Sequence, residues 1–129
     1  MENPVVLVVE DEPLLRLDVV DFLRDSGMEV REAANADHAI GVLEEGHPVH
    51  LVFTDIDMPG SMDGLRLARV VAERWPPTRI IVTSGFRTVE ITDIPDGSVF
   101  FSKPYRPEDV IASMRELLAG RTARQAPRN

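Results

Sequence analysis

Five short apolar runs recur along the chain and set its overall pattern. Unbroken runs of β-branched and other apolar residues, four to six residues long, are typical of strands buried on both faces of a parallel sheet. The second run alternates apolar and polar positions instead, which indicates an edge strand. The predicted strands are Pro4–Val9, Met28–Ala33, Val49–Thr54, Ile80–Thr83 and Val99–Ser102.

Between these runs, apolar residues return at the spacing of amphipathic helices. Proline suits a first helical turn and Asn35 is a good N-cap residue. The predicted helices are Pro13–Ser26, the segment after Asn35, Leu65–Trp75 and the segment that begins at Pro107. In the first of these helices, the spacing places the apolar residues Leu15, Val19, Phe22 and Leu23 on one side.

The segment Arg87–Gly97 has only a faint helical pattern and contains Pro95, which predicts a short or irregular helix. Strands and helical segments therefore alternate five times along the chain. Such alternation predicts an α/β fold, in which helices cover both faces of a five-stranded parallel sheet. The flavodoxin-like, doubly wound strand order 2-1-3-4-5 with right-handed crossovers is the expected topology.

The chain length of 129 residues suits one domain, which we expect to span residues 1–119. Residues 120–129 are polar and include three arginines, so they are predicted to form a flexible basic tail. The net charge of −8 disfavours a general attraction to nucleic acid or to anionic membranes. The absence of cysteine excludes disulfides, thiolate metal sites and a cysteine nucleophile.

The first apolar run has no basic segment before it and ends at the acidic triplet Glu10-Asp11-Glu12. This pattern is typical neither of a signal peptide nor of a membrane span, so a cytoplasmic location is expected.

Polar residues follow four of the five predicted strands at the point where each strand ends. Glu10 and Asp11 follow the first, Asp55 the third, Ser84 the fourth and Lys103 the fifth. Ligands bind beyond the carboxyl ends of the strands in open parallel sheets, beside the switch in strand order. We therefore expect these side chains to meet at one edge of the sheet.

Carboxylates brought together in this way repel one another by roughly 4 kcal/mol per pair at an intermediate dielectric. A hard divalent cation relieves that repulsion, and oxygen ligands favour Mg²⁺ over zinc. An aspartate can also act as a nucleophile and form an acyl phosphate. Lys103 and Ser84 could then neutralise or hydrogen-bond the phosphoryl oxygens around Asp55.

Short motifs in this order and spacing resemble the receiver domain of two-component response regulators, from about Val5 to Leu118. The matching pieces are Val8-Val9-Glu10-Asp11-Glu12-Pro13, Thr54-Asp55-Ile56-Asp57-Met58-Pro59-Gly60, Asp63-Gly64, Ser84-Gly85 and Ser102-Lys103-Pro104. The resemblance implies that Asp55 is the phosphoacceptor. It also implies an Mg²⁺ site in which Asp11 binds directly, Glu10 often through water, and Asp57 through its backbone carbonyl.

The resemblance assigns further roles on the last two strands. Ser84 matches the hydroxyl residue that follows the phosphoryl group, although the adjacent Thr83 leaves that assignment open by one position. Lys103 matches the active-site lysine, Pro104 a proline that commonly has a cis bond, and Phe100 the aromatic switch residue. A helix before the fifth strand that is shorter than usual would alter the surface through which such domains dimerise or signal.

A phosphorylation switch is the leading interpretation: a histidine kinase or histidine phosphotransferase donates to Asp55, and a protein partner responds. Such a chain is a regulator that at most phosphorylates and dephosphorylates itself. One alternative is an inert receiver-like interaction module. Another is a small phosphohydrolase, because Asp55-Ile56-Asp57 mimics the Asp-x-Asp pair of the haloacid-dehalogenase group.

Overall fold

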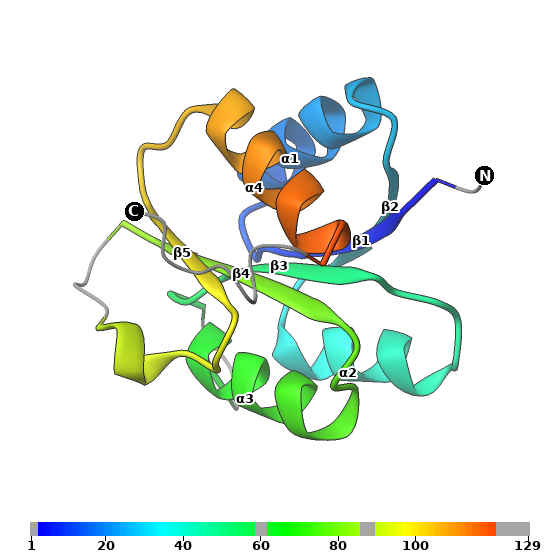
Figure 1. Cartoon of the computed structure of the whole chain (residues 1–129), viewed down its shortest axis with the longest axis vertical. Helices are drawn as coiled ribbons and strands as arrows, with labels where there is room; N and C mark the ends of the chain where they lie inside the picture. The colour runs from blue at the N-terminus through cyan, green and yellow to red at the C-terminus, as the bar shows by residue number, and fades with distance from the viewer. Residues whose placement is uncertain (1–2, 59–61, 86–89, 121–129) are drawn as a thin grey trace.

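A single five-stranded parallel sheet forms the centre of the molecule (Figure 1). The computed structural model describes residues 3–58, 62–85 and 90–120. Every strand pair is parallel and the order is β2-β1-β3-β4-β5, which confirms the predicted topology and the edge position of the second strand. The strands are β1 Val5–Val9, β2 Glu29–Ala33, β3 Leu51–Asp55, β4 Arg79–Ser84 and β5 Val99–Ser102.

Helices cover both faces of this sheet, with α1 and α4 on one face and α2 and α3 on the other (Figure 1). The helices are α1 Pro13–Asp25, α2 Ala36–Glu44, α3 Gly64–Arg74 and α4 Pro107–Leu118. Between β4 and β5 the described residues contain one three-residue 3₁₀ helix, η1 Ile91–Asp93. Residues 87–89 of the segment predicted to form a short or irregular helix lie outside the described residues, and in its described part the helix is short, as predicted.

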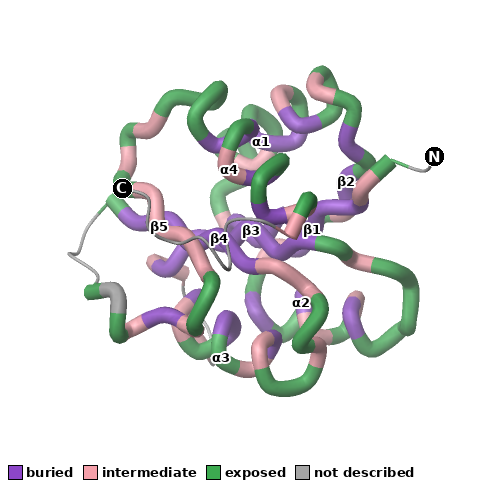
Figure 2. Tube along the Cα trace, viewed as in Figure 1, coloured by how far each residue is buried: buried purple, intermediate pink, exposed green. Residues whose placement is uncertain are grey.

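The core consists of two hydrophobic layers, one on each face of the sheet. Side chains alternate along a strand, so Val6 and Val8 of β1 join the layer under α1 and α4, whereas Leu7 and Val9 join the layer under α2 and α3. All five residues of β1 and all five of β3 are buried, and these two strands lie in the buried centre of the molecule in Figure 2. Burial of a side chain of this size contributes about 1.5–3 kcal/mol, so these layers hold the strand ends in place.

The local signals at the helix ends agree with the structure in most places. The Asn35 side chain accepts a hydrogen bond from the His38 N–H at 2.8 Å, as expected of an N-cap. On the apolar side of α1, Leu15 is 45% exposed and does not join the core. Val19, Val20 and Leu23 are the buried residues of α1, and Phe22 packs against the same hydrophobic layer.

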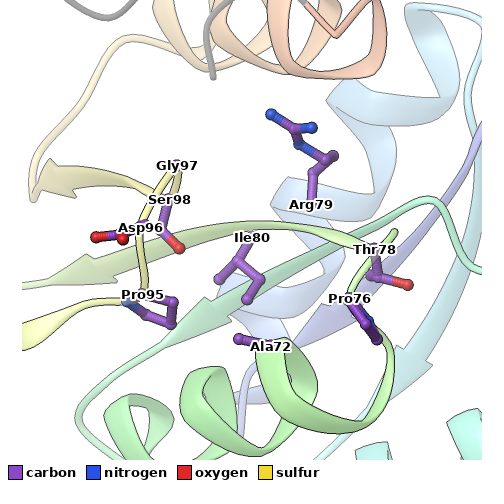
Figure 3. A pocket seen from close by; sticks show the side chains of 9 residues that line it. All are labelled: Ala72, Pro76, Thr78, Arg79, Ile80, Pro95, Asp96, Gly97 and Ser98. Atoms are coloured by element: carbon purple, nitrogen blue, oxygen red, sulfur yellow. The ribbon is translucent and has the colours of Figure 1, made fainter. Parts of the chain in front are cut away.

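A small hollow of about 190 Å³ lies beside the short connection that contains η1 (Figure 3). Arg79, Ile80 and Pro95 are among the residues that line it, and the side chains of Arg79 and Ile80 extend in opposite directions in this view. Arg79 begins β4 and Ser98 directly precedes β5, so the hollow lies at the amino ends of these strands. The acidic residues follow the opposite, carboxyl ends.

The predicted division at residue 119 stays a prediction, because residues 121–129 of the predicted tail lie outside the described residues. Pro59 and Gly60 of the quoted motifs also lie outside them.

The first residue of α3 packs directly on the backbone of Asp55. The Gly64 N–H donates to the Ile56 carbonyl at 3.1 Å, and a Cβ atom at Gly64 would overlap the Asp55 carbonyl group. A glycine at this position therefore allows the helix to begin against the end of β3.

We predict that Gly64→Ala lowers the free energy of unfolding by about 2 kcal/mol or more, because backbone atoms cannot move aside cheaply. Gly41→Ala is the matched control: its new methyl group meets nothing within 4 Å, and alanine favours the α2 helix by about 0.5–1 kcal/mol. Urea unfolding measures both values. Equal stability of the two variants would contradict this packing.

Candidate functional site

Three carboxyl groups meet at the carboxyl ends of β1 and β3. Oxygen atoms of Glu10, Asp11 and Asp55 all lie within 4.8 Å of one another. Glu10 and Asp55 are each only 6% exposed, whereas Asp11 is half-buried. The parallel pairing of β1 with β3 therefore brings together the acids that the sequence predicted to meet.

Lys103 reaches this acidic group from the end of β5. Its Nζ atom lies 3.2 Å from Asp55 Oδ2 and 3.6 Å from Glu10 Oε1. The Lys103 N–H donates to the Ser84 carbonyl at 3.0 Å, and the peptide bond between Lys103 and Pro104 is cis. The lysine thus supplies one positive charge to two buried carboxyl groups.

Burial raises the pKa of Glu10 above its ordinary value of 4.5 and that of Asp55 above 3.8. Burial is the largest cause for both groups, because a low-dielectric surrounding disfavours the charged form. Lys103 lowers both pKa values, while the charge of Asp55 raises that of Glu10 and the charge of Asp57 raises that of Asp55. The effect of Lys103 on the two pKa values is therefore smaller than the combined effect of burial and the neighbouring acids.

Backbone contacts fix the orientation of the two buried carboxyl groups. The Asp57 N–H donates to Asp55 Oδ1 at 3.3 Å, and the Glu12 N–H donates to Glu10 Oε2 at 3.1 Å. Arg16 donates to the Glu10 carbonyl at 2.6 Å from the first turns of α1. The two N–H contacts therefore orient the carboxyl groups, and the Arg16 side chain holds the backbone at Glu10.

The hydroxyl residues of β4 have different environments. Ser84 is the last residue of the strand, and its Oγ atom donates to Asp57 Oδ2 at 2.7 Å. Thr83 pairs with Asp55 across the sheet and is 2% exposed. Phe100 is half-buried and packs against the hydrophobic layer under α2 and α3.

The residues at this edge suit a hard divalent cation. All three carboxyl groups of the cluster offer oxygen ligands, and cysteine is absent from the chain. Oxygen-rich sites of this kind favour Mg²⁺ over softer metals. The pKa values of Glu10 and Asp55, raised by burial, also show that the folded protein holds this charge at a cost that a cation would reduce.

A groove that the sequence analysis missed opens onto the same site. It has a volume of about 790 Å³ and runs between α1 and the β5–α4 connection. Its apolar lining consists of Leu15, Val19, Phe22, Pro104, Tyr105 and Pro107. Glu10 and Lys103 also line it, so the groove is continuous with the carboxyl cluster.

Tyr105 is the central aromatic residue of this groove. Its ring meets Phe22, Phe53 and Phe101 edge to face, with ring centroids 6.5, 6.1 and 6.2 Å away. Burial, followed by the charges of Glu10, Asp55 and Asp18, raises the pKa of Tyr105 to about 12. The only sequence signal for it was its place two residues after Lys103.

The histidines take part in local structure away from the carboxyl cluster. His50 Nδ1 accepts a hydrogen bond from the Val5 N–H at 2.9 Å, and His38 Nδ1 accepts one from the Ala34 N–H at 3.3 Å.

Within the described residues, every helix is too short or too polar to cross a membrane.

The family model of the response regulator receiver domain matches residues 6–115 of the chain. Among solved structures, a response regulator receiver protein from Sinorhizobium medicae superposes with a TM-score of 0.84 at 32% identity. That similarity covers 92% of this chain and 96% of the other.

Two curated relatives illustrate the range of proteins that contain such a domain. The response regulator receiver protein CpdR of Brucella abortus is 33% identical over 116 residues, which cover 88% of this chain and 95% of CpdR. The nitrogen assimilation regulatory protein NtrX of Azorhizobium caulinodans is 31% identical over 110 residues, or 82% of this chain. The chain spans about a quarter of the length of NtrX and of the NtrX-like relatives. The match to the family model, the strand order and the carboxyl cluster of this chain all point to the same family. The chain belongs to the response regulator receiver domain family of two-component signalling.

Proposed function

We propose that Asp55 accepts a phosphoryl group from a phosphohistidine on a histidine kinase or histidine phosphotransferase. The observation that carries this proposal is the meeting of Asp55 with Glu10, Asp11 and the Lys103 ammonium group at the sheet edge. An Asp55 carboxylate oxygen attacks the phosphorus atom, a P–O bond forms, and the P–N bond to the imidazole breaks. The imidazole nitrogen leaves with the electron pair.

In this proposal the residues around Asp55 position the phosphoryl group and neutralise its negative charge. Asp11 and Asp55, with Glu10 and the Asp57 carbonyl, would hold Mg²⁺. When bound, the metal would offset the negative charge of the acids and of the phosphoryl oxygens. Lys103, 3.2 Å from Asp55 Oδ2, can pair with a phosphoryl oxygen once Asp55 is modified.

We propose that the output is a change in affinity for a protein partner. The Ser84 hydroxyl moves to a phosphoryl oxygen, and Phe100 changes rotamer to fill the space. Thr83 is the less suitable hydroxyl, because it lies within the strand opposite Asp55, whereas Ser84 ends the strand. A difference of about 1–3 kcal/mol in partner binding free energy between the resting and the phosphorylated arrangements would give a useful response. A cytoplasmic location belongs to the same proposal.

The groove beside α1 is the surface on which we propose that the phosphohistidine donor binds. A macromolecule that delivers a phosphoryl group to Asp55 must approach the carboxyl cluster. Glu10 and Lys103 lie beside Asp55 and also line the groove, so a donor in the groove would lie next to the cluster. The groove is apolar inside, and Asp18, Asp21 and Asp25 also line it. This combination favours a donor helix with apolar side chains and basic neighbours.

The first prediction from the proposed function concerns the phosphoryl acceptor. Acetyl phosphate with Mg²⁺ should add one phosphoryl group to the wild-type protein, as measured by intact mass, and EDTA should prevent it. Asp55→Asn should abolish the labelling, while Asp18→Asn on the surface of α1 should keep it. Labelling of Asp55→Asn at the wild-type rate would refute the assignment, and an unlabelled wild-type protein would favour the inert module.

The second prediction concerns charge and stability without metal. The pKa of Asp55 is higher in the folded than in the unfolded protein, so its ionisation destabilises the fold as the pH rises through the raised pKa. Asp55→Asn should therefore raise the melting temperature by about 2–5 °C at pH 7 and by less at pH 4. Mg²⁺ should raise the wild-type melting temperature and narrow the difference. A lower melting temperature of the variant at pH 7 would contradict this account.

The third prediction separates the docking groove from the chemistry. The measurement uses each autophosphorylated histidine kinase that labels the wild-type protein. Leu15→Arg should lower the rate of phosphoryl transfer from the kinase about tenfold, while its rate of labelling by acetyl phosphate should stay within about twofold of the wild-type rate. Leu17→Arg is the matched control, because Leu17 is 53% exposed and lies outside the groove lining. Equal kinase rates for the two variants would remove the groove from the proposal.

A further inference from the structure

The Ser84 hydroxyl already has a strong partner in the resting protein. Its Oγ atom donates to Asp57 Oδ2 at 2.7 Å, and Ser84 is 2% exposed. A hydroxyl-to-carboxylate bond of this length is of the charge-assisted kind, which is stronger than a bond between neutral groups. Ser84 ends β4, whereas Asp57 lies two residues beyond the end of β3, so the bond joins neighbouring strand ends.

A serine hydroxyl has one proton to donate. It therefore cannot donate to Asp57 and to a phosphoryl oxygen on Asp55 at the same time. If Ser84 moves to the phosphoryl group, the bond to Asp57 must break first. The strength of that bond then enters the equilibrium between the resting and the activated arrangements.

We propose that the Asp57 side chain is a positioning residue that restrains the Ser84 hydroxyl and biases the domain toward its resting arrangement. This inference rests on the proposed function, because it assumes that Ser84 serves the phosphoryl group on Asp55. It assigns to the Asp57 carboxylate a role separate from that of its backbone carbonyl. The carboxylate competes with the phosphoryl oxygens for one proton.

A simpler effect of Asp57 has to be separated from this restraint. The charge of Asp57 also acts on Asp55 directly, since it is among the causes that raise the pKa of Asp55. Removing the charge would favour an anion at Asp55 even if Ser84 played no part. A double-mutant cycle between positions 57 and 84 isolates the part that passes through the hydroxyl.

The test measures the affinity for beryllofluoride, a phosphoryl mimic, by calorimetry at saturating Mg²⁺. The proteins are the wild type, Asp57→Ala, Ser84→Ala and the double variant, each checked for folding by urea unfolding. Asp57→Ala should tighten binding about fivefold or more when Ser84 is present. In the Ser84→Ala background, the factor by which Asp57→Ala tightens binding should be at least threefold smaller.

Asp57→Asn provides a second comparison, because it removes the charge but keeps an acceptor oxygen. Under the proposed restraint, Asp57→Asn should tighten binding less than Asp57→Ala, whereas a purely electrostatic effect makes the two equal. Equal effects of Asp57→Ala in both backgrounds would overturn the restraint and leave the proposed function standing. Failure of the wild-type protein to bind beryllofluoride would overturn the proposed function and the restraint with it.

Discussion

The repulsion among the carboxyl groups at one end of the sheet is the constraint on which the rest of the site depends. Glu10 and Asp55 are nearly buried, Asp11 stands beside them, and oxygen atoms of all three lie within 4.8 Å. Each like-charged pair at a few Å costs roughly 4 kcal/mol at an intermediate dielectric. A fold that keeps such a group needs rigid support and a source of positive charge, and Lys103 supplies part of that charge.

The support comes from the parallel sheet and the two apolar layers around it. Parallel pairing places the carboxyl ends of β1, β3, β4 and β5 along one edge, so residues far apart in sequence become neighbours. Buried strands fix these ends, and backbone N–H groups orient the carboxyl groups of Glu10 and Asp55. A negatively charged site can therefore exist without local collapse, and it is suited to take up a cation and a phosphoryl group.

The sequence predicted the sheet, its order and the meeting of the acidic residues, because apolar runs and the residues after them follow simple periodic rules. The same rules could not predict contacts that depend on the rotation of one element against another. Leu15 fits the helical period, yet it lines an open groove, because α1 meets the sheet through Val19, Val20 and Leu23. The Ser84–Asp57 hydrogen bond likewise needs the positions of two strand ends, which no spacing along the chain contains.

A crystal structure of the protein grown with Mg²⁺ and beryllofluoride tests the central claim most directly. The account predicts a cation held by the carboxylates of Asp11 and Asp55, with beryllofluoride on Asp55 and the Lys103 ammonium group against it. A cation bound elsewhere on the protein, or an Asp55 that stays unmodified while the cluster remains without a cation, would contradict it.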